Sequence, residues 1–191
     1  QGNVDAQGLL GRMYLHGRGV AQDDKQAVAW YRKAAEQGNA NAQLMLGVTY
    51  KLGRGVAQDD KQAVAWYRKA AEQGHVDAQF NLGLMYFNGT GVQQDDQTAL
   101  KWFRLAADQG DAFAQFALGN MYFMGRGVAK NFVASYALGN LSASEVPPGF
   151  SQPAQMRDAA AAQLTAEQVE AGQALTREMR DGKPVKVLDA Y

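Results

Sequence analysis

The chain has 191 residues, with 19 basic and 19 acidic side chains and no cysteine. The balanced charge excludes a basic field that would hold nucleic acid or an anionic membrane surface, and the absence of cysteine excludes a disulfide framework and a thiolate metal site. No apolar run approaches the roughly 20 residues that a membrane-spanning helix needs.

The chain opens on a Gln-Gly pair that recurs later at a fixed spacing. The pair at residues 1–2 returns at residues 37–38, 73–74 and 109–110, where it closes a repeated segment. We therefore expect the sequence to begin at the end of a helix, and a signal peptide or an earlier repeat to have been removed.

A repeat with a period of 36 residues follows. The segment GRGVAQDDKQAVAWYRKAAEQG runs from Gly17 to Gly38 and returns unchanged from Gly53 to Gly74. A third copy over 89–110 has drifted to GTGVQQDDQTALKWFRLAADQG, and a fourth diverges soon after residue 128. A fixed period in this range predicts a stacked array, which usually offers a surface for a partner rather than a pocket for chemistry.

Each repeat predicts two helices joined by a glycine-containing loop. In the second repeat the first helix, over about 40–52, has an apolar face formed by Ala42, Leu46, Gly47 and Tyr50. The second helix, over about 60–73, has an apolar face formed by Ala63, Trp66, Tyr67, Ala70 and Ala71. We expect the small residues to allow close helix approach and Trp66 and Tyr50 to be the large side chains that fill the core.

The helix ends carry their own signals. Asp59 or Asp60 is expected to cap the second helix, and Asp59 stands at capping-box spacing from Gln62. Gly74 is expected to end that helix in the left-handed conformation. The paired aspartates therefore predict helix caps rather than calcium ligands.

The fourth repeat keeps its first helix but changes its second. Asn131-Phe132 replaces the aspartate pair, Leu138 stands in the tryptophan column, and SEVPPGFSQP over 144–153 ends the repeat. A short helix near 154–162 and a longer one that begins after Thr165, which is at capping-box spacing from Gln168, are expected to cap the array. The tail over 183–191 is expected to be mobile or to lie along the surface.

The pattern Ala-x-x-x-Leu-Gly-x-x-Tyr, then Gly-x-Gly-Val, then Ala-x-x-Trp-[Tyr/Phe]-x-x-Ala-Ala-x-x-Gly resembles the Sel1-like repeat, a relative of the tetratricopeptide repeat with a longer loop. The resemblance covers about residues 2–143. It implies an all-α, right-handed α-α solenoid of four 36-residue helix-loop-helix repeats, with the first helix of each repeat (the A helix) on the concave side. It also implies a scaffold or adaptor, which in bacteria is very often exported.

On this basis the chain divides into an array, a linker, a cap and a tail. The array occupies 1–143, with repeats over about 3–38, 39–74, 75–110 and 111–144. A proline-containing linker over 144–153 precedes capping helices over 154–182 and the tail over 183–191.

Residues typical of catalysis are not grouped in the sequence. The two histidines, His16 and His75, occupy different columns of the repeat, whereas a metal site needs three or four ligands at one place. The serines lie at or after residue 135, outside any nucleophile-elbow pattern, and the GRGV loops lack the strand and the Gly-Lys-Ser/Thr of a phosphate loop. We expect no catalytic residue, no metal and no cofactor.

The positions that differ between repeats are the candidates for recognition. The resemblance places five columns of the A helix beside its packing face, and we call them the variable columns. They are Gly8, Leu44, Phe80, Phe116; Leu9, Met45, Asn81, Ala117; Arg12, Val48, Leu84, Asn120; Leu15, Lys51, Phe87, Phe123; and His16, Leu52, Asn88, Met124.

The first hypothesis is a non-catalytic adaptor that holds a peptide or protein in its concave groove. The expected partner-binding residues are Arg12, Leu44, Val48, Lys51, Phe80, Asn81, Leu84, Phe87, Asn88, Phe116, Asn120, Phe123 and Met124. Space filling between A helices, or cover by the cap, is the alternative role for the aromatic members.

Two other functions stay open. One is a bacterial immunity protein that neutralises a secreted toxic effector such as a lipase. The other is a cell-wall-related hydrolase, which the lack of a nucleophile disfavours. We expect an exported or periplasmic protein, with a cytoplasmic location as the alternative, that is a monomer or a weak end-to-end oligomer and binds no nucleic acid.

Overall fold

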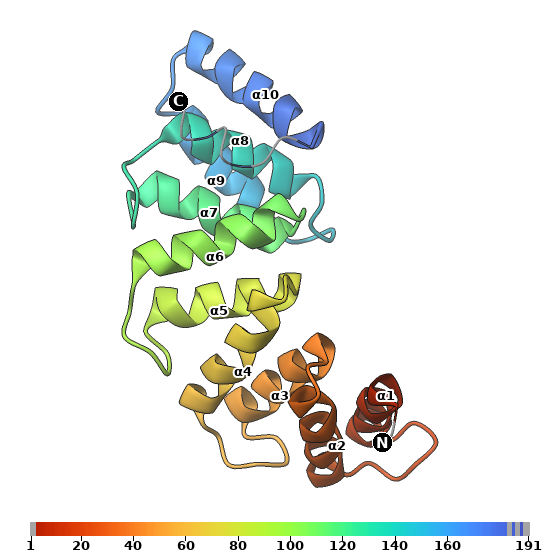
Figure 1. Ribbon diagram of the computed structural model, residues 1–191. Coiled ribbons are helices and arrows are strands. Elements are labelled where there is room, and N and C mark those ends of the chain that lie inside the picture. Colours follow the sequence, from red (N-terminus) through yellow and green to blue (C-terminus); the bar gives the residue numbers. More distant parts are fainter. Residues whose placement is uncertain (1–2, 183–184, 186–187, 189–191) are drawn as a thin grey trace. The chain divides into compact units, whose positions relative to one another are not determined.

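The computed structural model describes residues 3–182, Val185 and Leu188, and within these residues all regular structure is helical (Figure 1). This confirms the all-α solenoid of four repeats. The helices are α1 (Val4–His16), α2 (Asp24–Glu36), α3 (Ala40–Leu52), α4 (Asp60–Glu72), α5 (Val76–Asn88), α6 (Asp96–Asp108), α7 (Ala112–Met124), α8 (Phe132–Ala143), α9 (Gln152–Ala161) and α10 (Ala166–Arg180).

The helices fall into two compact units. Unit 1 extends to Gln94 and contains α1–α5, and unit 2 begins at Asp95 and contains α6–α10. The A helices are α1, α3, α5 and α7. Within unit 1, α3 packs against both α2 and α4, so each helix buries its apolar face against the next one along the chain.

The two adjacent aspartates of the first loop have different roles. The Asp23 carboxylate accepts a hydrogen bond from the Gln26 backbone N–H at 3.0 Å and caps α2, as Asp59 caps α4. Asp24 instead accepts from the guanidinium of Arg54 in the next loop at 2.9 Å. At this loop the first aspartate therefore caps the start of a helix, and the second joins one repeat to the next.

The loop backbone lies directly on the preceding repeat. Gly55 has φ +74°, and a Cβ there would lie 2.2 Å from the carbonyl oxygen of Asp24. Only glycine combines this left-handed conformation with such a close approach. Gly55, like Gly91 and Gly127 at the same place in the following loops, is thus a packing residue between repeats as well as a turn residue.

The buried ring of the second helix is Tyr67 rather than Trp66. Tyr67 is 1 % exposed and covers Gly47 of α3, where a Cβ would come within 2.6 Å of the ring. Trp66 and Tyr50 are only half-buried, and the Lys69 ammonium lies 4.0 Å from the centroid of the Trp66 ring. The expectation that Trp66 and Tyr50 fill the core was therefore wrong: both cover its edge.

The fourth repeat departs from the pattern because α9 and α10 pack on α8 (Figure 1). Gly139 stands in the column of Tyr67, and a Cβ there would lie 2.8 Å from Arg157 Cβ on α9. Met156 of α9 covers Gly119 instead of a ring from α8, and Leu138 is fully buried. The lack of a side chain at Gly139 thus allows α9 to pack closely against α8.

The C-terminal elements begin close to where the sequence predicts. Thr165 and Gln168 form the expected capping box of α10. Of the tail, the structure describes Val185 and Leu188, which are both buried, and the Val185 N–H donates to the Asp108 carboxylate. The expectation for the rest of 183–191 falls outside the described residues.

No helix among the described residues is long and apolar enough to cross a bilayer.

Candidate partner-binding site

Most residues in the variable columns of the A helices reach the surface, whereas the leucines of the packing face in the second, third and fourth repeats do not. Leu46, Leu82 and Leu118 of the packing face are 0 % exposed. Of the residues in the five variable columns, Leu15 is buried, and the others are half-buried or exposed. Except for Leu15, the positions that change from repeat to repeat are therefore at least partly accessible.

In unit 1 the predicted residues are half-buried or exposed. Arg12 and Asn88 are exposed. The Asn81 side-chain amide donates to the Asp77 carbonyl at 2.7 Å and so bonds to its own helix. The half-buried members are Leu44, Val48, Lys51, Phe80, Asn81, Leu84 and Phe87.

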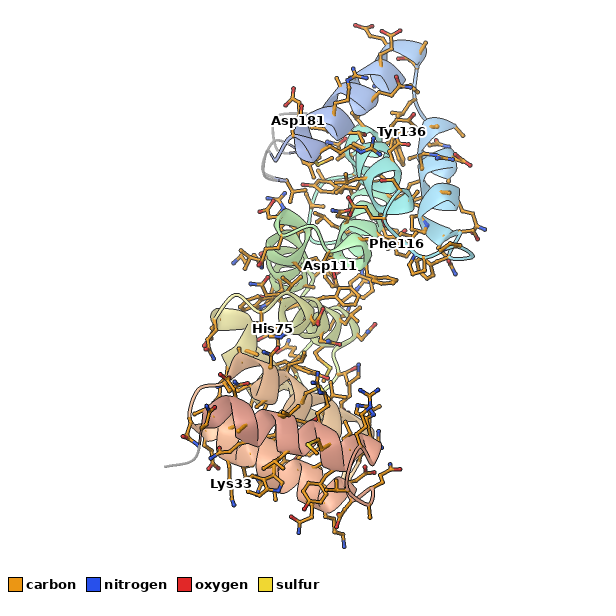
Figure 2. The ribbon with its side chains drawn as sticks, turned by 90° about the vertical axis from the view of Figure 1, so that its right-hand side faces the viewer. Lys33, His75, Asp111, Phe116, Tyr136 and Asp181 are labelled. Carbon is orange, nitrogen blue, oxygen red and sulfur yellow. The ribbon has the colours of Figure 1, made fainter. Side chains whose placement is uncertain are left out.

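In unit 2 two of the predicted aromatic side chains have partners within the chain. Phe116 meets the ring of Phe150, from the segment between α8 and α9, edge-on with centroids 5.9 Å apart (Figure 2). The ring centroids of Phe123 and Phe132 are 5.3 Å apart. Asn120 is half-buried, and Met124 is 45 % exposed. Phe116 and Phe123 thus contribute to packing within unit 2 and also reach its surface.

The structure brings two of the predicted residues, Arg12 and Leu44, to one cavity between α1 and α3. Its volume is about 450 Å³. Gly8 explains the space: the variable column that holds Leu44, Phe80 and Phe116 has no side chain in α1, and a Cβ at Gly8 would meet no atom within 4 Å. We call this cavity the α1–α3 cleft. It is lined by Asp5, Gly8, Leu9, Arg12, His16, Tyr31, Asn39, Asn41, Ala42, Leu44 and Met45.

A buried hydroxyl group without a partner lies in the lining of this cleft. Tyr31 is 2 % exposed, and its hydroxyl has no hydrogen-bond partner among the described residues. Burial raises the pKa of Tyr31 to about 12, although the positive charges of Arg12 and Arg54 act in the opposite direction. At neutral pH the hydroxyl is therefore a donor, and buried donors normally have acceptors.

Of the charged side chains around the cleft, some have hydrogen-bond partners within the chain and one has none among the described residues. The Arg54 guanidinium is held by Asp24 and by the Leu15 carbonyl, at 2.9 and 3.0 Å. The Asp5 carboxylate accepts from the Asn39 side chain at 3.0 Å. Arg12 makes no hydrogen bond or ion pair with any part of the chain that the structure describes. The lining of the cleft therefore includes two residues, Tyr31 and Arg12, whose donors have no acceptor among the described residues; the Tyr31 hydroxyl is buried and the Arg12 guanidinium is exposed.

Sequence reasoning missed most of the cleft. A glycine in a column of large residues was the available signal for Gly8, since it marks missing volume. Tyr31 gave no signal, because its column is otherwise a core column. His16 is exposed and belongs to the lining of the cleft.

His75 occupies the N-cap position of α5 but makes no capping bond (Figure 2). Its Nε2 instead lies 3.0 Å from the Asn41 side-chain oxygen in the preceding repeat. Within the described residues no group of three or more His, Asp or Glu side chains is arranged to hold a metal ion.

The family described as Sel1 repeat matches residues 4–39, 40–75, 76–111 and 112–145. The chain belongs to the Sel1 repeat family. None of the curated proteins matches the chain. Sel1 repeats generally act as protein-interaction scaffolds and are typically non-catalytic.

Solved structures of Sel1 repeat proteins support the same assignment. The chain is 36 % identical to c5321, a protective antigen of uropathogenic Escherichia coli, with a TM-score of 0.85 over 96 % of this chain and 39 % of that one. It is 32 % identical to a Sel1 repeat protein from Oxalobacter formigenes, with a TM-score of 0.79 over 98 % and 77 % of the two chains. A third structure, a Sel1 repeat protein from Klebsiella pneumoniae, is 26 % identical with a TM-score of 0.52 and covers 84 % and 79 %. The chain thus spans less than half the length of c5321.

Proposed function

We propose that this Sel1 repeat chain is a non-catalytic interaction protein that binds a protein or peptide partner on the variable columns of its A helices. The observation that carries the proposal is the accessibility of most residues in those columns beside the buried leucines Leu46, Leu82 and Leu118 of the packing face. Large apolar side chains at partly open positions, such as Phe80, Leu84 and Phe87, are typical anchors of an interface.

Polar groups accompany these anchors in the C-terminal halves of the A helices. Arg12, Lys51 and Asn88 would supply the hydrogen bonds that orient a partner. In unit 2 the exposed Met124 and the half-buried Phe123 extend the same columns. Because Phe116 and Phe123 also pack within unit 2, truncating either is expected to affect stability as well as binding.

The test is affinity capture from the lysate and envelope fractions of the native host, with wild type, Phe87→Ala and a matched control, Leu105→Ala. Leu105 is exposed on α6, which is not an A helix. If Phe87 is an anchor, its truncation weakens binding by roughly 1–4 kcal/mol, and the control does not. A lower melting temperature with unchanged affinity would make Phe87 a packing residue and contradict the proposal at that position.

The same experiment separates the narrower hypotheses. Capture of one exported toxic enzyme, with loss of its activity, would support an immunity protein. Recovery of the partner from the envelope fraction would support export to the periplasm, and recovery only from the cytosol would contradict it. Turnover of cell-wall fragments by the purified chain would contradict a non-catalytic role.

Sedimentation of the purified chain tests the proposed oligomeric state. We propose a monomer or a weak end-to-end oligomer, so the average mass should stay near that of one 20.7 kDa chain at low concentration. A stable dimer at that concentration would contradict this.

A further inference from the structure

We propose that the α1–α3 cleft binds an acidic side chain, glutamate or aspartate, on a partner segment that carries apolar residues on both sides of it. This inference rests on the proposed function and names the chemistry of one contact.

The first step is the space. The cleft has a volume of about 450 Å³, within the range of sites that bury a small ligand or a few side chains. It exists because Gly8 leaves the position of Leu44 empty in α1. Such a recess among half-buried side chains accepts one inserted side chain from outside.

The second step is the polar lining. The hydroxyl of Tyr31 is buried and without an acceptor, and the guanidinium of Arg12 is exposed and unpaired within the described residues. A buried donor without an acceptor destabilises the free protein, and an acceptor supplied by a partner removes that cost. Two donors, one of them cationic, favour a carboxylate over a neutral amide.

The third step is the position along α1. Asp5 would repel a carboxylate, but it lies seven residues from Arg12, which is about 10 Å along the helix axis at ~1.5 Å per residue, and it is bonded to Asn39. His16 lies one turn beyond Arg12 on the same lining and supplies a further donor. The Arg12 end of the cleft is therefore the end that attracts an anion.

The fourth step distinguishes a side chain from a chain end. Leu9, which is 49 % exposed, stands on the α1 side of the cleft, and Leu44 and Met45 stand on the α3 side. A segment that crosses the cleft places its acidic residue between the walls and an apolar residue on each of them. A terminal carboxylate would leave one of these walls uncovered.

The experiment is a titration of the ¹⁵N-labelled full chain, followed by amide and side-chain NMR signals, with three short peptides. They are acetyl-Leu-Glu-Leu-amide, its neutral isostere acetyl-Leu-Gln-Leu-amide, and acetyl-Leu-Ala-Leu with a free carboxyl terminus. We expect the glutamate peptide to shift the signals of Gly8, Leu9, Arg12 and Leu44 and to bind at least about tenfold more tightly than the glutamine peptide.

Three variants test the named groups. Tyr31→Phe removes the hydroxyl and is expected to weaken the glutamate peptide about tenfold, whereas the matched change Tyr67→Phe in the next repeat leaves binding unchanged. Gly8→Leu fills the recess and abolishes binding. Because a Cβ at Gly8 meets nothing within 4 Å, this variant should fold, which its melting temperature and amide spectrum check.

Several results would overturn the inference. They are equal binding of the glutamate and glutamine peptides, binding of the free-terminus peptide alone, retention of binding by Gly8→Leu, and no binding at millimolar peptide. In the affinity capture, a partner lost with Phe87→Ala but kept with Gly8→Leu leaves the proposed function standing and overturns the role of the cleft. A partner lost only with Gly8→Leu supports the cleft and contradicts the apolar anchor.

Discussion

Replacing Gly47 by alanine tests the packing of one repeat. In an isolated helix this change stabilises by about 1 kcal/mol, because alanine restricts the unfolded chain and glycine does not. In α3 the new Cβ would come within 2.6 Å of two carbon atoms of the Tyr67 ring. Tyr67 is 1 % exposed, so the ring has little room to retreat.

The magnitude follows from the two opposing effects. Overpacking of this kind costs about 1–3 kcal/mol, so the Gly47→Ala variant should be destabilised by about 0–2 kcal/mol after the gain in helix propensity. Gly8→Ala is the matched control, since it lies in the A helix of the first repeat with no atom within 4 Å of its Cβ. That control should instead be stabilised by about 1 kcal/mol.

The assay compares the two variants by thermal unfolding and by hydrogen exchange of the α3 amides. A difference of about 2 kcal/mol corresponds to a separation of about 4–8 °C in melting temperature for a chain of this length. Exchange of the α3 amides should quicken in Gly47→Ala only. Combining Gly47→Ala with Tyr67→Leu should recover part of the loss, because the smaller side chain makes room. A Gly47→Ala variant as stable as Gly8→Ala would refute the assigned packing of α3 against α4.

Three further changes test the loops and the buried hydroxyl. Gly55→Ala should destabilise far more than Gly38→Ala in thermal unfolding: both have positive φ, but only at Gly55 does a Cβ meet backbone, 2.2 Å from the Asp24 carbonyl oxygen. The hydrogen bond from Arg54 holds the pKa of Asp24 below its usual 3.8. The stability that the Asp24 carboxylate contributes is therefore present above that pH and is lost as the pH falls through the lowered pKa. The difference in stability between wild type and Asp24→Asn should close in acid, and a constant difference would contradict the pairing. Burial raises the pKa of Tyr31 from 10.0 to about 12, so wild type should lose stability as the pH rises through that window, while Tyr31→Phe loses less. At neutral pH Tyr31→Phe should be at least as stable as wild type, because it removes a buried donor without an acceptor, and a large loss of stability would show that the hydroxyl has a partner.

The sequence by itself determined the repeat, the helices and most of their ends. These features depend on signals in the sequence itself: the 36-residue period, the aspartate at the N-caps of α2, α4 and α6, and the glycine that takes a positive φ just after each of these three helices. Asp59, Gly74 and the Thr165–Gln168 capping box were all readable because each acts on backbone groups within a few residues.

The tertiary structure alone decided which large side chain enters the core. Trp66 and Tyr67 are neighbours on one helix, and either satisfies the apolar pattern. Gly47 on the opposing helix decides which of the two rings is buried, because it leaves space for the Tyr67 ring. The period of a helix defines a broad apolar face, and the shape of the opposing helix selects within it.

The cleft was hidden from the sequence for the same physical reason. Its space comes from a missing side chain on α1, its walls from α1 and α3, and its unpartnered hydroxyl from α2. A pattern along one helix records which side chains are present. A cavity forms where side chains from several helices leave space between them, and that depends on how the helices pack together.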